Sequence, residues 1–128
     1  LELEGLTGIK IYLDISGDPD SLSFSAKKAL YRIIIECTGN AIKHSGCTSI
    51  WVDFNIGEEK TRLSVKDDGI GFDIDKAHQE RNGLGLYNIK SLIRSFNGSY
   101  KICSEEKAGT TFNIEFLNRD IKENKDED

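Results

Sequence analysis

One stretch of the chain is patterned to form a helix with a single buried face. Between Ala26 and Ala41 the apolar residues recur at intervals of three and four, the spacing of one helix face. Two polar residues, Asn40 and His44, fall inside this apolar arc, and Glu36 falls at its edge. An inward Asn or Glu costs free energy unless it is hydrogen-bonded or coordinated. The helix therefore predicts either a contact with a neighbouring loop or a site for a ligand or metal.

Stretches of alternating apolar and polar residues predict the strands of a sheet. The alternation is clear from Ile9 to Ile15, and the turn-forming segment from Gly17 to Asp20 follows it. It returns on both sides of Gly57 to Lys60, where it predicts a hairpin. A second amphipathic helix ends at Asn97 and Gly98. The expected strands are residues 9–15, 50–56, 63–67, 99–104 and 110–117, and the expected helices are residues 26–44 and 84–96.

These elements predict an α+β fold built as a two-layer sandwich. Its sheet is expected to be mixed but mostly antiparallel, because most strands are linked as hairpins, and to be covered by helices on one face. With 128 residues and 38% hydrophobic content, the chain can bury one ordinary core, so residues 1–117 are expected to form a single domain. Residues 118–128 are charged and lack an apolar face, and we expect them to be a disordered tail.

Composition excludes several classes of function. The net charge is −5 and the Lys and Arg residues are scattered, which argues against a dedicated nucleic-acid surface. The three cysteines fall on different expected elements, as is typical of reduced thiols in a cytoplasm. The apolar runs are too short to cross a bilayer, so we expect no direct membrane contact from this segment. Because the sequence contains no methionine, we expect it to be a piece of a longer protein.

The second strand of the hairpin ends in another inward polar residue. Its alternation places Asp67 on the same face as Leu63 and Val65, where an unpartnered carboxylate is costly. Asp67 therefore joins Glu36 and Asn40 as a candidate binding residue.

Glycines gather at three places near the ends of predicted elements. Glycine lets a backbone approach a ligand closely, and amides at a helix start bind phosphate, so the glycines before the second helix form a candidate phosphate site. Tight turns explain any one cluster more easily than all three together. Neither a dinucleotide fingerprint nor a P-loop is present. The clusters are Gly69 with Gly71, Gly83 with Gly85, and Gly109 beside Thr110.

Four motifs, taken together, resemble the ATP-binding domain of bacterial sensor histidine kinases. The likeness is greatest to the subfamily whose partners are response regulators with helix-turn-helix output domains. The superfamily also holds the DNA gyrase, heat-shock chaperone and mismatch-repair ATPases, and the match covers about residues 5–117. The motifs are Glu36-x-x-x-Asn40-Ala-Ile-Lys43-His44-Ser45, Asp67-x-Gly69-x-Gly71-Phe72, Gly83-Leu84-Gly85-Leu86 and Gly109-Thr110.

The resemblance implies a role for each of these positions. Asn40 would coordinate a Mg²⁺ ion that bridges the ATP phosphates, with Lys43 and His44 near those phosphates. Asp67 would accept a hydrogen bond from the adenine amine, assisted by the hydroxyl of Thr110. The glycine-rich motifs would supply the close backbone contacts: Gly69 and Gly71 beside the base, and Gly83, Leu84, Gly85 and Leu86 at the phosphates.

Glu36 is the candidate catalytic residue. It stands one helical turn before Asn40, from where it could act as a base or orient the phosphate acceptor. Family members often carry a second Asn where this chain has Gly39, a poor helix former. The histidine-bearing acceptor helix of the family is not found in these 128 residues, and neither His44 nor His78 resembles its histidine.

The resemblance thus implies a protein-histidine kinase whose catalytic domain uses ATP and Mg²⁺. Its expected partners are the dimerisation and phosphoacceptor domain of the same protein and the receiver domain of a response regulator. The expected location is the cytoplasm, as the cytoplasmic part of a sensor kinase with or without a membrane anchor. Two alternatives remain at this point: a serine kinase of the anti-sigma-factor type, and a nucleotide-sensing module without catalytic activity.

Overall fold

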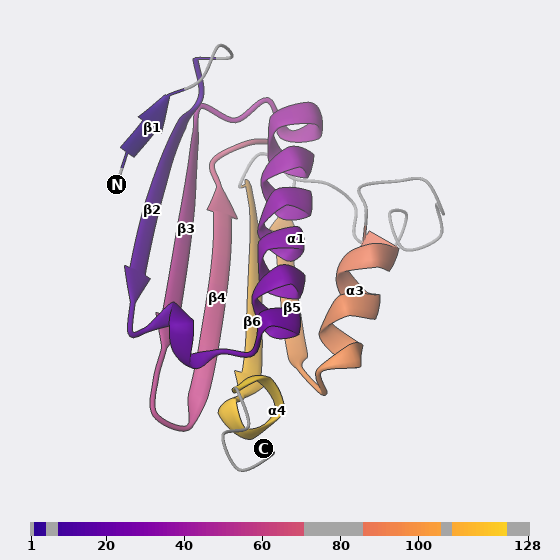
Figure 1. The fold of residues 1–128 in the computed structure, drawn as a ribbon. Helices are drawn as coiled ribbons and strands as arrows, with labels where there is room; N and C mark the ends of the chain where they lie inside the picture. The colour runs from indigo at the N-terminus through magenta and orange to yellow at the C-terminus, as the bar shows by residue number, and fades with distance from the viewer. Residues whose placement is uncertain (1, 5–7, 71–85, 106–108, 123–128) are drawn as a thin grey trace.

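The computed structural model describes residues 2–4, 8–70, 86–105 and 109–122, which form two layers (Figure 1). One layer is a six-stranded sheet with the order β1-β2-β3-β4-β6-β5, and helices α1 and α3 cover one of its faces. The β2–β3 pair is parallel, whereas the other pairs are antiparallel. The predicted α+β sandwich with a mixed, mostly antiparallel sheet is therefore confirmed.

Most elements lie close to their expected positions, and one strand was not predicted at all. That strand, β1, pairs with residues 10–12 of β2 and is too short to show an alternation. The strands are β1 Glu2–Glu4, β2 Lys10–Ser16, β3 Ser49–Ile56, β4 Lys60–Asp67, β5 Ser99–Glu105 and β6 Gly109–Leu117. The helices are η1 Pro19–Ser21, α1 Phe24–Asn40, η2 Ala41–Ser45, α3 Leu86–Ser95 and α4 Asn118–Ile121.

The long helix α1 is bounded by residues that favour a helix start and a helix stop. Ser23 caps its beginning, because the Ser23 hydroxyl accepts a hydrogen bond of 3.1 Å from the Ala26 amide. Its end continues into one π-helical turn, η2, and the chain then turns at Gly46, which has a φ of 62°. Among the described helices, none is long and apolar enough to cross a membrane.

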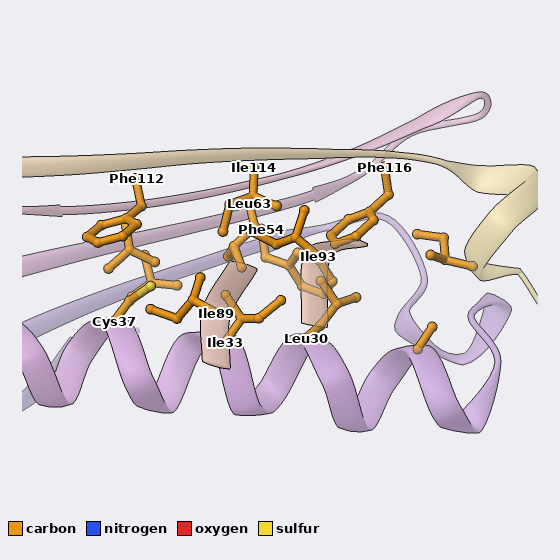
Figure 2. Close-up of a cluster of buried hydrophobic side chains, with 14 of the residues drawn as sticks. Leu30, Ile33, Cys37, Phe54, Leu63, Ile89, Ile93, Phe112, Ile114 and Phe116 are labelled. Carbon is orange, nitrogen blue, oxygen red and sulfur yellow. The ribbon is translucent and has the colours of Figure 1, made fainter. Parts of the chain in front are cut away.

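The core lies between α1 and the helix-covered face of the sheet. Figure 2 shows Leu30, Ile33 and Cys37 of α1 pointing toward Phe112 and Phe116 of the sheet. Ile89 and Ile93 of α3 join the same cluster, and all of these side chains are at most 4% exposed. Burying one Leu, Ile or Phe side chain stabilises a fold by about 1.5–3 kcal/mol, so this interface holds the helices on the sheet.

The charged segment after residue 117 does not match its expectation throughout. The structure continues through α4, with Asn118 and Ile121 both buried, so the expected domain boundary at residue 117 is too early. Asn118 holds the β3–β4 turn: its Nδ2 donates to the Gly57 carbonyl at 2.7 Å, and its Oδ1 accepts from the Thr61 hydroxyl at 2.6 Å. A single amide with two matched partners carries no apolar periodicity, which is why the pattern missed it.

Replacing Asn118 should therefore weaken the fold. Asn118→Ala leaves the Thr61 hydroxyl and the Gly57 carbonyl without this partner, and we expect a loss of about 1–3 kcal/mol in the free energy of unfolding. Urea denaturation measures it. Asn113→Ala, at an exposed position of β6, is the matched control and should change stability by less than about 0.5 kcal/mol. Equal effects of the two changes would contradict the assignment.

Two glycines should respond to substitution in opposite directions. Gly109 has a φ of 80°, and a Cβ there would collide with the carbonyl oxygen of Asp67 on the neighbouring strand. Gly39 is helical and nothing lies within 4 Å of where its Cβ would stand. Gly109→Ala should cost about 1–3 kcal/mol of stability, whereas Gly39→Ala should add about 1 kcal/mol. Urea denaturation of both variants decides this, and a neutral Gly109→Ala would refute the close approach of the two strands.

Candidate functional site

The candidate residues from three elements gather at one end of the sheet. The end of α1, the end of β4 and the start of β6 all lie at this end of the molecule (Figure 1). Asp67 is the last residue of β4 and pairs with Thr110 of β6 on one side and with Ile50 of β3 on the other. Residues that are distant in the sequence thus meet at one end of the sheet.

Asp67 is buried, as its place in the alternation predicts. It is 6% exposed, and its Oδ1 accepts a hydrogen bond of 2.8 Å from the amide of Gly69. This local turn, formed by an Asp side chain and the backbone two residues later, fixes the direction of the carboxylate. A buried carboxylate held in this way suits recognition of a neutral or cationic donor group.

Thr110 is the second nearly buried polar residue at this edge. It is 3% exposed, and its hydroxyl oxygen lies 2.8 Å from that of Ser104 on β5. The β4–β6 register places Thr110 directly across from Asp67, so the structure brings these two candidates together.

Glu36 and Asn40 follow one another by a single turn near the end of α1, and both are half-buried. The sequence analysis did not identify the partner of Glu36, which is Arg32: its Nε lies 3.1 Å from Glu36 Oε1. The Arg32 side chain is largely exposed, so this pair one turn apart contributes little to stability. Glu36 is therefore a carboxylate at the rim of the site, with a cation beside it.

The remaining candidates divide into those that the structure describes and those that it does not. Lys43 is exposed on η2, three residues after Asn40. Leu86 begins α3, and its side chain is buried in the core, so only its backbone can serve a ligand. The side chain of His44 lies outside the described part of the structure, as do Gly71, Gly83, Leu84 and Gly85.

Asp68, the neighbour of the candidate Asp67, makes contacts that the sequence did not predict. Its carboxylate accepts hydrogen bonds from the Thr48 hydroxyl at 2.6 Å, the Thr48 amide at 2.8 Å and the Ser49 amide at 3.0 Å. The hydrogen bond from the Thr48 hydroxyl, together with those from the two amides, lowers the pKa of Asp68 below its ordinary value. Asp68 thereby ties the end of β4 to the start of β3, close behind η2. In the sequence, only the alternation of inward and outward residues distinguishes Asp68 from Asp67.

The side chains at this end of the sheet offer oxygen acceptors to a ligand, but they do not form a complete coordination shell for a metal ion. Within the described residues, no group of three or more His, Cys, Asp or Glu side chains is placed to hold a metal ion. A hard cation such as Mg²⁺ binds through one or two protein oxygens when the phosphates of a ligand supply others. The half-buried amide of Asn40 fits that limited role.

Two hollows of the described structure lie elsewhere. One, of about 420 Å³, is on the open face of the sheet beside Arg62, Asn113 and Glu115. The other, of about 640 Å³, lies between α1 and α3 beside Phe24 and Phe96. Neither is lined by the buried polar residues, so the burial of these groups identifies the candidate site better than surface shape does.

The chain is similar in sequence to known proteins of one family. Residues 25–120 match the family described as histidine kinase-, DNA gyrase B- and HSP90-like ATPase. The sensor histidine kinase MctS of Rhizobium johnstonii is 39% identical over 106 residues, which are 82% of this chain and 23% of that protein. The sensor histidine kinase YdfH of Bacillus subtilis is 39% identical over 85 residues, 66% of this chain and 21% of that protein.

A solved structure shows the same fold. The crystal structure of full-length ShkA in complex with AMPPNP superposes with a TM-score of 0.71 at 23% identity, covering 92% of this chain and 27% of that chain. This chain therefore spans about a quarter of the length of such proteins. The extent of the family match and the identity to MctS lead to one assignment: this chain belongs to the histidine kinase-, DNA gyrase B- and HSP90-like ATPases, and among them to the ATPase domains of sensor histidine kinases.

Proposed function

We propose that this chain binds Mg·ATP and donates the γ-phosphate to a histidine on a separate domain of the same polypeptide. The observation that carries the proposal is the buried Asp67 carboxylate, paired across the sheet with Thr110 at the end where α1 presents Asn40. The relatives named as sensor histidine kinases support it. ShkA, which shares the fold, was solved with the ATP analogue AMPPNP.

In this proposal the adenine base is recognised at the end of the sheet where β4 ends and β6 begins. The adenine exocyclic amine donates to Asp67, whose carboxylate the Gly69 amide already orients. The Thr110 hydroxyl adds a second polar contact beside it. Gly109 keeps the start of β6 close to β4, since a side chain there would push the two strands apart. Gly69 and Gly71 would let the backbone pass beside the base.

The phosphates would lie along the end of α1 and η2. Asn40 offers an amide oxygen to a Mg²⁺ ion, which when bound neutralises phosphate charge and holds the γ-phosphate in line for transfer. Lys43 and His44 would add charge and hydrogen bonds there, and the backbone of Gly83, Leu84, Gly85 and Leu86 would supply amides. Asp68 would hold the chain just after η2 in place through its hydrogen bonds with Thr48 and Ser49.

Glu36 would serve the transfer step itself. From the rim of the site its carboxylate could accept a proton from the attacking histidine or orient the ring. Arg32 stands beside this carboxylate, with its Nε 3.1 Å from Glu36 Oε1. Alignment of the acceptor nitrogen with the γ-phosphate then supplies much of the rate.

The partners follow from this chemistry. A dimerisation and phosphoacceptor domain of the same protein would present the histidine, and the receiver domain of a response regulator with a helix-turn-helix output domain would take the phosphate from it. The chain would act on the cytoplasmic side of the cell, where ATP is available. The names of the relatives do not favour a serine kinase of the anti-sigma-factor type, and a non-catalytic nucleotide sensor remains the second candidate.

The base contact can be tested by one isosteric change. Asp67→Asn replaces the charged acceptor by a neutral one and should weaken ATP and ADP binding by about 1.5–3 kcal/mol, because charge-assisted hydrogen bonds are of that size. Calorimetry measures the affinity, and thermal unfolding verifies that the variant is folded. Asp53→Asn, exposed on β3, is the control and should bind as wild type does. Unchanged affinity in folded Asp67→Asn would remove Asp67 from the site.

Binding and transfer should separate at the end of α1. Asn40→Ala should abolish the Mg²⁺ dependence of ATP binding, whereas Glu36→Gln should bind Mg·ATP almost normally. In the full-length protein Glu36→Gln should slow phosphoryl transfer at least about 100-fold, the usual scale of a lost acid–base group.

The readout for transfer is acid-labile, base-stable phosphate on the protein. Glu59→Gln, an exposed change in the β3–β4 turn, controls for the loss of one negative charge. If Glu36→Gln transfers phosphate at the wild-type rate, Glu36 is only the partner of Arg32. If no phosphohistidine forms while ATP binds normally in the wild type, the nucleotide-sensing alternative gains support.

A further inference from the structure

A third polar residue extends the Asp67–Thr110 pair across the sheet. Ser104 of β5 is in register with Thr110 of β6, which is in register with Asp67 of β4, so the three residues form one row over three neighbouring strands. Two positions away along these strands stand Ile102, Phe112 and Val65, which all pack in or against the core. The row therefore lies on the helix-covered face of the sheet, because residues two apart on a strand share a face.

Ser104 is in direct contact with the Thr110 hydroxyl. The two hydroxyl oxygens are 2.8 Å apart, and Ser104 Oγ is also 3.4 Å from the Gly109 carbonyl oxygen. Thr110 is 3% exposed, so its hydroxyl depends on protein or ligand partners rather than on bulk water. Ser104 is half-buried on the side of Thr110 that faces away from Asp67.

This contact limits what the Thr110 hydroxyl can offer to a ligand. A hydroxyl has one proton to donate and two lone pairs to accept with. One of these directions is taken by Ser104, and β5 and β4 lie on opposite sides of β6. The directions that remain are fixed relative to Asp67 instead of rotating.

We propose that Ser104 is a positioning residue for base recognition: it fixes the Thr110 hydroxyl so that Thr110 and Asp67 present one rigid pattern to the purine edge. The proposal rests on the proposed function, because it assumes that this edge binds the base of ATP. Ser104 itself does not touch the nucleotide. It acts through Thr110, so its effect must disappear when the Thr110 hydroxyl is removed.

The test is a double-mutant cycle on nucleotide affinity. Ser104→Ala should weaken ATP binding about fivefold, the scale of one neutral hydrogen bond, and Thr110→Val should weaken it at least as much. In the Thr110→Val background, Ser104→Ala should have no further effect. Ser104→Thr, which keeps the hydroxyl, should restore most of the affinity, and Ser99→Ala on the other face of β5 should bind ATP as wild type does.

A second ligand separates positioning from a general structural effect. Inosine triphosphate carries the same phosphates but lacks the amine that Asp67 would accept from. Ser104→Ala should reduce the preference for ATP over inosine triphosphate. A general destabilisation of the fold would instead weaken the binding of both nucleotides equally. Calorimetry on the 128-residue domain gives all of these affinities. If Ser104→Ala does not fold, Ser104→Cys keeps the side-chain size with a weaker donor and is expected to show the same loss.

Three results would overturn the inference. The first is wild-type affinity in folded Ser104→Ala, and the second is an equal loss of ATP and inosine triphosphate affinity in that variant. The third is the same fivefold loss in the Thr110→Val background, which would mean that Ser104 acts independently. The Asp67→Asn variant shows whether the role of Ser104 or the proposed nucleotide site itself has failed. If Asp67→Asn weakens binding and Ser104→Ala does not, only the role of Ser104 fails. If neither change matters, the proposed function fails with it.

Discussion

The pairing of β4 with β6 is the constraint on which the candidate site depends. It aligns Asp67 with Thr110 on the helix-covered face, where both side chains are nearly excluded from water. A shift of one residue in this register would turn Asp67 to the open face and bury Lys66 or Asp68 instead. Gly109 allows the close approach of the strands at this end, and the core residues Val65 and Phe112, two positions further, hold the register by their burial.

The neighbouring acids Asp67 and Asp68 divide two tasks because a strand alternates its faces. Asp67 faces the helices and offers a buried acceptor, whereas Asp68 faces solvent and binds Thr48 and Ser49 at the start of β3. Through Asp68, the end of β4 is connected to the segment that follows α1. The chain that follows η2 is thus fixed to the end of β4 by hydrogen bonds within the protein.

Periodicity predicted the elements well wherever one face of an element is fully buried. The alternations of β3, β4 and β6 and the apolar face of α1 match the core, and the inward Asp67 was visible for the same reason. The sequence did not predict burial or contacts that depend on strand pairing or on single polar interactions. Ile15 alternates like a core residue but is 47% exposed on β2, near the edge of the sheet. The buried amide of Asn118 and the Arg32 partner of Glu36 likewise depend on neighbours that only the fold brings together.

The binding of ATP where α1 and β4 end and β6 begins is tested most directly by adding Mg·ATP to the wild-type domain and following its backbone amide resonances. We expect saturable shifts for Asn40, Asp67, Gly69 and Thr110 in the presence of Mg²⁺, with the resonances of the open face of the sheet unchanged. Contradiction would be the absence of saturable shifts, or shifts concentrated around Lys101 and Asn113, which line the hollow on that open face.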